Sequence, residues 1–153
     1  MDVHHAELVI TSELQQLPQV RDLVAQALHR GRFPDRYLNR LMIVADEAVS
    51  NIIEHGYGGN ADQAATTIHI ALTVTTEEFR IMITDQGLSY DPNESDEVDI
   101  VNHVNSGRSG GLGVSLMRKI MDVIEYQYQA GRRNRLLLVK FAGSSSARNT
   151  VIS

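Results

Sequence analysis

The stretch of sequence that decides the fold is residues 45–59, ADEAVSNIIEHGYGG. Glu47, Asn51, Glu54 and His55 recur in it at spacings of three and four residues, which places them along one face of a helix. At about 100° per residue, the four side chains share one sector of the helix circumference. The glycines that follow favour a break in the helix. The pattern predicts a helix with a polar face, which alone is as typical of a solvated surface as of a functional site.

The opposite face of this helix is apolar. It consists of Leu38, Leu41, Met42, Ala45, Val49 and Ile52. An apolar stripe of this kind packs against a hydrophobic core. A turn at residues 33–35 supplies the start of the helix, and Gly56 is its expected end.

The length and composition of the chain limit its class. At 153 residues it is long enough for one domain with one substantial core. Its net charge is 14 − 19 = −5 and it has no long block of Lys or Arg, so we expect no direct contact with nucleic acid. Cysteine is absent, which excludes disulfides, thiolate zinc sites and cysteine nucleophiles and fits a reducing compartment.

Targeting and membrane signals are not apparent in the sequence. The first ten residues, MDVHHAELVI, lack the basic region and long apolar run of a secretory signal. No segment approaches the roughly 18 consecutive apolar residues that a membrane-spanning helix needs. We therefore expect a soluble cytoplasmic protein that does not enter a membrane.

Alternating and helical patterns surround the opening stretch. Residues 6–11 predict a strand, and residues 18–30 follow the period of an amphipathic helix. Residues 66–75 and 79–84 alternate apolar and polar side chains, which predicts a hairpin of half-buried strands. His69 falls on the polar side of this hairpin, so a surface or interlayer position is expected rather than a ligand role.

Residues 85–113 break the alternation and are rich in acidic residues and glycine. So long a segment within a compact domain indicates either disorder or a functional lid, and its glycines favour the lid. Residues 124–129 and 136–141 predict a closing hairpin. The tail at residues 144–153 is expected to be flexible, which leaves residues 1–143 as a single domain.

A third helix is predicted between the lid and the closing hairpin. Its apolar face is predicted to carry Leu116, Met117, Ile120 and Ile124. The order of strands and helices predicts an α/β (α+β) two-layer sandwich, with a mixed, mostly antiparallel sheet and helices on one face. The short hairpin turns exclude an all-parallel sheet, because parallel strands need long crossover connections.

A first candidate motif, Asp85-Gln86-Gly87, stands at the end of a predicted strand. A carboxylate there can accept a hydrogen bond from an amino group such as that of adenine, and Gly87 lets the backbone approach a flat ligand closely. A strand-ending Asx turn is the alternative. The acidic residues that follow do not have the spacing of an EF-hand loop.

A second candidate motif, SGRSGGLG at residues 106–113, precedes the third helix. Glycines that lead into a helix present free backbone N–H groups and the positive end of the helix dipole, which favour phosphate. Arg108 could add a positive charge. A Gly/Ser linker explains this motif equally well, and it matches neither a P-loop nor a dinucleotide-binding fingerprint.

Three motifs therefore occur in a set order: DEAVSNIIEHGYGG, DQGLSYDP and GGLGVSLMRKIMDVIEY, followed by NRLLLVK. In this order they resemble the Bergerat ATP-binding fold of the GHKL superfamily, over about residues 7–141. The short single-domain form is similar to the bacterial RsbW-type anti-sigma factors. Those proteins are serine kinases that act on a small anti-anti-sigma (STAS-like) partner.

The resemblance implies site roles by position. Glu47 is implied to be the general base and Asn51 the Mg²⁺ ligand at one ATP triphosphate, because carboxylates abstract hydroxyl protons and neutral amide oxygens suit hard cations. Asp85 is implied to bind the adenine amino group, and Gly87 to line the base. His55 would lie near the lid, as a phosphate contact or as a structural hydrogen bond.

The resemblance also implies a lid that wraps the phosphates. The residues concerned are Arg108, Ser109, Gly110, Gly111, Leu112 and Gly113. Glu54 is expected to be a solvated neighbour without a role in the site.

The function implied by the resemblance is that of an ATP-dependent serine-protein kinase of the anti-sigma type. Its implied partners are an anti-anti-sigma (STAS) protein, a sigma factor and a second copy of the chain. An ATP-binding regulatory module without kinase activity is the alternative, since a glutamate on a helix surface can persist without a catalytic role. A scaffold that has lost nucleotide is disfavoured, because all three motifs are present.

Overall fold

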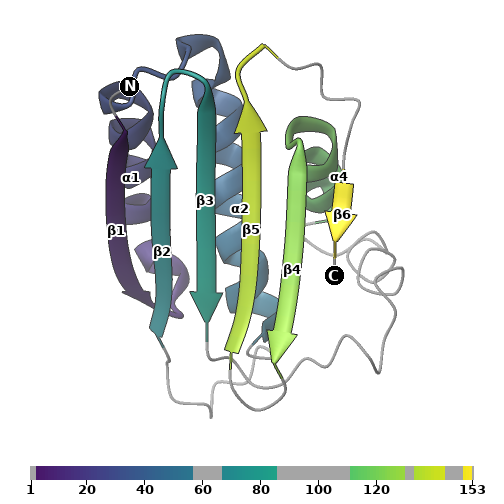
Figure 1. The fold of residues 1–153 in the computed structure, drawn as a ribbon. Helices are drawn as coiled ribbons and strands as arrows, with labels where there is room; N and C mark the ends of the chain where they lie inside the picture. The colour runs from purple at the N-terminus through teal and green to yellow at the C-terminus, as the bar shows by residue number, and fades with distance from the viewer. Residues whose placement is uncertain (1–2, 57–66, 86–110, 130–132, 144–149, 153) are drawn as a thin grey trace.

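The computed structural model describes residues 3–56, 67–85, 111–129, 133–143 and 150–152. A six-stranded sheet forms one layer, and the helices form a second layer on one face of it (Figure 1). The strands are β1 (His4–Thr11), β2 (Thr67–Val74), β3 (Glu78–Asp85), β4 (Val123–Gln129), β5 (Arg133–Phe141) and β6 (Thr150–Ile152). The helices are α1 (Leu17–Arg30), α2 (Leu38–Gly56) and α4 (Gly111–Ile120), with 3-10 turns η1 (Leu14–Gln16) and η2 (Asp35–Tyr37). The predicted two-layer sandwich is confirmed.

The sheet has the strand order β1-β2-β3-β5-β4-β6. All neighbours are antiparallel except β4 and β6, which are parallel, so the sheet is mixed and mostly antiparallel as predicted. One row across it pairs Leu8 with Ile70, Ile70 with Ile83 and Ile83 with Leu136. These residues face the helices, because side chains of a strand alternate between the two faces.

The core lies between the sheet and the helices. Ile70, Ile83 and Leu41 are fully buried there, with accessible fractions of 0%. The apolar stripe of α2 includes the predicted Ala45 and Val49 and also Val44, Ala48 and Ile53, which complete the helical period. Leu38, Met42 and Ile52 are partly buried against this core.

Close packing of backbone sets the end of α1. Gly31 caps this helix, and its N–H donates to the Ala27 carbonyl over 2.8 Å. A Cβ at Gly31 would lie 2.5 Å from Cγ1 of Val74 on β2. Only glycine fits where α1 passes the end of this strand, because no larger residue can approach so closely.

The third helix differs from its prediction at both ends. Residues Gly111, Leu112 and Gly113 form the first turn of α4, although the lid was predicted to include them. Ile124 was predicted both on the helix face and at the start of the strand at residues 124–129. It belongs to β4, so the helix assignment is wrong and the strand assignment is confirmed. The strand starts early because the N–H of Asp122 donates to the Val139 carbonyl over 2.9 Å, which begins the ladder with β5.

The prediction also made β5 too short and missed β6. β5 begins at Arg133 rather than at residue 136, because Asn134 pairs with Asp85 across the sheet. β6 was not predicted, and its residues Thr150–Ile152 pair in parallel with Val123–Glu125. Thr, Val and Ile suit a strand because their branched side chains pack well on a pleated surface. The division of the chain at residue 143 stays a prediction.

The arrangement of α2 determines where its polar face lies. This helix runs behind β3 and β5, toward the end of the sheet at which β3 ends and β5 begins (Figure 1). α4 packs beside it. Among the helices of the described residues, none is long and apolar enough to cross a membrane.

Candidate functional site

Glu47 lies on the polar face of α2 and is half-buried. Burial raises the pKa of its carboxyl above the ordinary value, and the negative charges of Asp46 and Glu54 raise it further. A carboxylate with a raised pKa is a stronger base. Raised carboxyl pKa values gather at functional sites, although structural clusters of like charges also produce them.

Asn51 follows Glu47 by one helical turn. Both Oδ1 and Nδ2 of its side chain are buried, and neither has a hydrogen-bond partner among the described residues. An unsatisfied buried polar group costs about 1–3 kcal/mol, so native proteins rarely retain one without a reason. The amide oxygen fits a hard cation or the water around it, and the amide N–H groups fit phosphate oxygens. Asn51 therefore has the chemistry of a ligand for Mg²⁺ and phosphate.

Asp85 is the last residue of β3 and is 3% exposed. Its Oδ1 accepts a hydrogen bond of 3.0 Å from Nδ2 of Asn134. Its neighbour across the other ladder is Ile68, which is fully buried. The carboxylate is therefore held in one orientation inside an apolar layer, and its further lone pairs can accept from an amino group.

Asn134 is a member of this site that sequence reasoning missed. The predicted strand began two residues later, so Asn134 was assigned to the preceding turn. A signal was present: Asn134, Leu136, Leu138 and Lys140 alternate with the residues between them. Extending the period of two backward places Asn134 on the helix-facing side of the sheet.

Glu54 and Asp46 also affect the site, although the sequence predicted no role for them. Glu54 follows Glu47 by seven residues, or about two turns, on the same face of the helix. Asp46 Oδ1 lies 3.2 Å from Nε of Arg21 on α1. This oxygen makes no hydrogen bond of acceptable geometry, so charge attraction rather than a directed bond holds the pair.

Several predicted site residues fall outside this geometry. Gly87, Arg108, Ser109 and Gly110 lie outside the described residues. Gly111, Leu112 and Gly113 begin α4, and His55 lies in the last turn of α2; the positions of their side chains are not described. α2, which carries Glu47 and Asn51, runs toward the end of the sheet at which Asp85 closes β3 and pairs with Asn134 of β5 (Figure 1).

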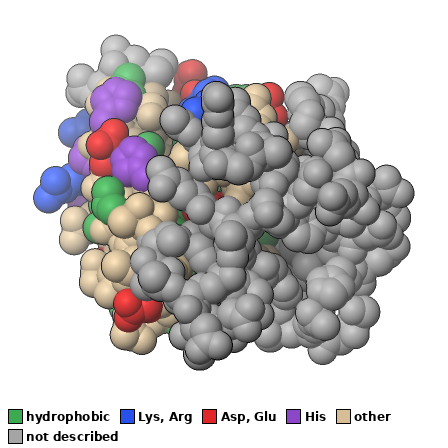
Figure 2. Space-filling model, turned by 90° about the horizontal axis from the view of Figure 1, so that it is seen from below, with side chains coloured by type: hydrophobic (Ala, Val, Ile, Leu, Met, Phe, Trp, Pro, Cys, Tyr) green, Lys and Arg blue, Asp and Glu red, His purple; other side chains and the backbone are tan. Residues whose placement is uncertain are grey.

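The surface near this end carries histidine beside acidic side chains, as the described part of Figure 2 shows. His69 Nε2 lies 3.7 Å from Glu7 Oε2, and both side chains are exposed. No group of three or more metal-ligating residues occurs within the described ranges. The expected surface position of His69 is confirmed.

A small hollow of about 100 Å³ lies on the other face of the sheet. Its lining residues are Met82, Glu125, Gln127, Arg135 and Leu137. Ligand pockets for molecules of nucleotide size measure about 300–1,000 Å³. This hollow is too small for a nucleotide, and it lies on the face away from α2.

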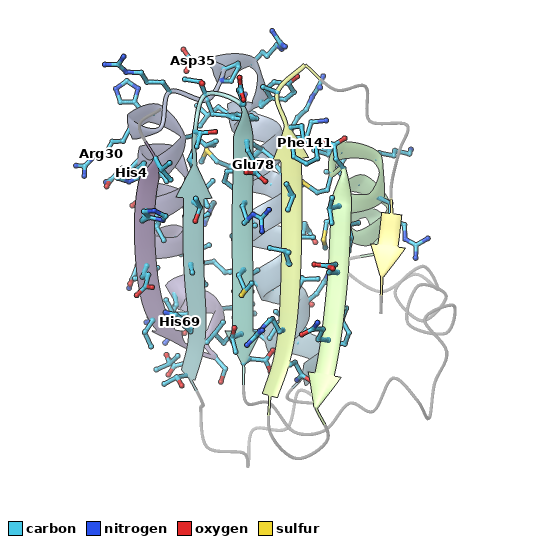
Figure 3. The ribbon with its side chains drawn as sticks, in the orientation of Figure 1. His4, Arg30, Asp35, His69, Glu78 and Phe141 are labelled. Atoms are coloured by element: carbon cyan, nitrogen blue, oxygen red, sulfur yellow. The ribbon has the colours of Figure 1, made fainter. Side chains whose placement is uncertain are left out.

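A second buried polar cluster lies at the opposite end of the sheet, near Phe141 (Figure 3). Lys140 Nζ is 3.5 Å from Asp122 Oδ2, and both side chains are almost fully buried. The same oxygen accepts the N–H of Phe141 over 2.7 Å. The Tyr37 hydroxyl accepts the N–H of Gly143 over 2.9 Å. This cluster connects the start of β4, the end of β5 and the start of α2. Its role is therefore structural.

Residues 10–140 match the family model described as the histidine kinase-like ATPase domain. The serine/threonine-protein kinase BtrW of Bordetella bronchiseptica is 32% identical over 117 residues, which cover 76% of this chain and 80% of that protein.

Two further relatives are similar over longer spans. The serine-protein kinase RsbW of Listeria monocytogenes is 25% identical over 80% of this chain and 81% of its own length. The serine-protein kinase RsbW of Bacillus cereus strain AH187 is 24% identical over 94% of this chain and 88% of its own length. The chain belongs to the family of histidine kinase-like ATPase domains and, within it, to the RsbW-like group.

Proposed function

We propose that this chain is a Mg·ATP-dependent protein-serine kinase of the anti-sigma type, which phosphorylates a small anti-anti-sigma (STAS-like) partner. The observation that carries the proposal is the polar face of α2. It presents a half-buried Glu47 of raised pKa one turn before Asn51, whose amide has no partner among the described residues. The names of the relatives, serine-protein kinase and serine/threonine-protein kinase, support the same activity.

In this proposal, nucleotide recognition begins at the end of β3. Asp85 accepts a hydrogen bond from the adenine amino group, and Gly87 lines the base. Asn51 would hold Mg²⁺, which would supply positive charge beside the phosphates. The residues that contact the phosphates are Arg108, Ser109, Gly110, Gly111, Leu112 and Gly113. His55 is a further phosphate contact.

Glu47 acts as the general base of the transfer. It takes the proton of the partner's serine hydroxyl while the serine oxygen bonds to the γ-phosphorus. The bond between the γ-phosphorus and the bridging oxygen breaks, and ADP leaves. The raised pKa of Glu47 favours this proton transfer, because it brings the base closer to neutral pH.

The test is incubation with ATP labelled at the γ-phosphate, Mg²⁺ and a purified STAS-domain protein. Label on a serine of that protein is the expected result, and Glu47→Gln should abolish it. Tight ATP binding without label on any STAS protein tested would favour a regulatory module that acts by binding alone.

The remaining parts of the proposal concern partners and location. The protein acts in the cytoplasm, binds a sigma factor in competition with its phosphorylation target, and forms a homodimer. Exposed apolar side chains near the N-terminus support the dimer, since Val9 in β1 is 60% exposed and Leu14 before α1 is 46% exposed. A monomeric mass in sedimentation equilibrium would contradict the dimer.

A further inference from the structure

One large apolar side chain of α2 faces solvent. Ile43 is 47% exposed, whereas every other large apolar side chain of this helix is buried or partly buried against the core. Ile43 precedes Glu47 by four residues, which places the two side chains one turn apart on the same face of the helix. It therefore contributes little to the core and lies beside the proposed general base.

Arg40 extends this exposed surface by a further turn. It precedes Ile43 by three residues and Glu47 by seven, so at about 100° per residue the three side chains share roughly 60° of the helix circumference. Arg40 is exposed, and within the described ranges no carboxylate lies close enough to form an ion pair with it. Together, Arg40 and Ile43 form what we call the α2 strip.

The spacing along α2 shows how close this strip is to the proposed reaction. A general base acts at hydrogen-bond distance, about 3 Å from the hydroxyl whose proton it takes. A helix rises about 1.5 Å per residue, so Ile43 lies roughly 6 Å and Arg40 roughly 10 Å from Glu47 along the axis. A standard protein interface covers about 800 Å² of each partner, which is a patch about 16 Å in radius. A protein whose serine reaches Glu47 therefore has the α2 strip within its reach.

The nucleotide limits the direction from which such a protein can approach. In the proposed function Asn51 would hold Mg²⁺, and Asn51 lies one turn beyond Glu47 toward the C-terminal end of α2. ATP takes that side of Glu47, so the partner protein approaches from the N-terminal half of the helix. The α2 strip lies in that half.

We propose that the α2 strip is a docking surface for the phosphoacceptor protein, on which Ile43 packs against an apolar side chain beside the target serine and Arg40 pairs with a carboxylate further from it. This inference rests on the proposed function, because it requires that Glu47 receives a serine from a protein partner. It gives Ile43 and Arg40 roles in recognition and none in the transfer of the phosphoryl group.

The two residues of the strip contribute differently to recognition. Burying the exposed part of Ile43 against an apolar side chain stabilises the ground state and the transition state of the complex equally. Loss of this contact should therefore raise KM without lowering kcat. An exposed arginine acts mainly on the rate of association, and this effect weakens as salt screens its charge.

The test measures kcat and KM for label transfer from ATP to a purified STAS-domain protein that the wild type labels. Ile43→Gln and Ile43→Leu both introduce good helix formers, but only leucine keeps the apolar surface. We expect KM for the STAS-domain protein to rise about fivefold or more in Ile43→Gln, and to stay within about twofold of wild type in Ile43→Leu. Both variants should keep the kcat of the wild type and its Kd for ATP.

The charge of Arg40 is tested by salt. In Arg40→Gln, KM for the STAS-domain protein should rise about threefold at low salt and equal that of wild type in about 0.5 M salt. An Arg40→Gln variant whose KM equals that of wild type at low salt overturns the role of Arg40.

Phe141→Gln is the matched control for Ile43→Gln. Phe141 is 42% exposed and lies at the opposite end of the sheet (Figure 3), so its replacement should leave KM for the STAS-domain protein unchanged. A rise in KM equal to that of Ile43→Gln would overturn the assignment of docking to the α2 strip. Circular dichroism checks that each variant folds.

The possible outcomes distinguish this inference from the proposed function. An unchanged KM in Ile43→Gln, with label still transferred, overturns the docking role and leaves the kinase activity intact. Equal rises of KM in the Gln and Leu variants also overturn it, since shape rather than apolar contact would then be responsible. Wild-type protein that labels no STAS-domain protein overturns the proposed function and this inference together.

Discussion

At the scale of single residues, the candidate site contains polar side chains in surroundings that are unfavourable for them. Glu47 is a carboxyl whose ionised form is disfavoured by burial and by the charges of Asp46 and Glu54. Asn51 has two buried polar atoms without partners among the described residues. Both features lower the stability of the free protein, so binding of a ligand offers a physical reason for them.

Replacement of Glu47 by Gln should separate binding, catalysis and stability. Its folded-state pKa lies above the reference value of 4.5, so the folded chain holds the proton more tightly than the unfolded chain. The resulting penalty is absent below about pH 4.5 and complete above the folded-state pKa. Glu47→Gln should therefore unfold at a higher temperature than wild type at neutral pH, but at the same temperature in acid. It should keep ATP binding and lose at least about 10²-fold in phosphoryl transfer.

For Glu47→Gln, calorimetry measures ATP binding, thermal denaturation across pH measures stability, and label transfer measures phosphoryl transfer. Equal transfer rates in the variant and the wild type would remove Glu47 from the mechanism. A stability difference that persists unchanged in acid would contradict the raised pKa.

Replacement of Asn51 by Ala should remove the part of the ATP affinity that depends on Mg²⁺. We expect a loss of roughly tenfold or more with Mg²⁺ present and little loss in a chelator. Titration calorimetry under both conditions measures the difference. Ser50→Ala is the matched control, since within the described part of the chain the Ser50 hydroxyl donates to the Glu47 carbonyl of the same helix. Equal losses with and without Mg²⁺ in Asn51→Ala would exclude a role as metal ligand.

At the scale of elements, α2 packs against the sheet with one face and carries residues of the candidate site on the other. Its apolar stripe buries Leu41, Ala45 and Val49 against the sheet, which orients Glu47 and Asn51 on the other side. The position of α1 beside it depends on the close approach of Gly31 to Val74. The geometry of the site therefore depends on how tightly these elements pack.

Replacement of Gly31 by Ala tests this packing. The added Cβ would meet the Val74 side chain and carbonyl at 2.5 to 2.8 Å, so the variant should lose about 1–3 kcal/mol of unfolding free energy. Gly143→Ala is the control, because its φ of 81° strains an alanine in open space without a clash. That variant should lose only about 1 kcal/mol. Urea denaturation measures both, and an equal or larger loss at Gly143 would contradict the close-packing argument.

At the scale of the whole molecule, the two ends of the sheet have different tasks. One end carries Asp85 and Asn134, and α2 runs toward it. The other end, where Phe141 lies (Figure 3), holds the buried Lys140–Asp122 pair. This division predicts that stability and catalysis can be altered separately.

Replacement of Lys140 by Met should destabilise the fold without changing the site. The variant leaves the Asp122 carboxylate buried without its cation, which costs roughly 3 kcal/mol or more. Arg80→Met is the control, since it removes the exposed pair with Glu78 at 3.0 Å and should cost less than about 1 kcal/mol. Chemical denaturation compares the two, and Kd for ATP should be unchanged in both. A large loss of ATP affinity in folded Lys140→Met would show that the two ends are coupled.

The sequence by itself determined the elements whose signals are local. The period of α2 predicted its core stripe and its polar face, and strict alternation predicted β2 and β3. The two-layer class followed from the order of these elements, and the structure confirms it. These predictions succeed because helix and strand periods are properties of neighbouring residues.

Only the tertiary structure decided which distant residues meet. Asn134 donates a hydrogen bond to Asp85, which lies 49 positions earlier in the sequence. β6 pairs with the edge of β4, although its 3 residues are too few to give a strand signal in the sequence. The start of β4 likewise depended on the hydrogen bond from the Asp122 N–H to the Val139 carbonyl of β5. Pairing across a sheet is set by register and by the burial of one face, and neither is present in a local pattern. The candidate site needed both, since its helix face could be predicted from sequence and the hydrogen bond between Asn134 and Asp85 could not.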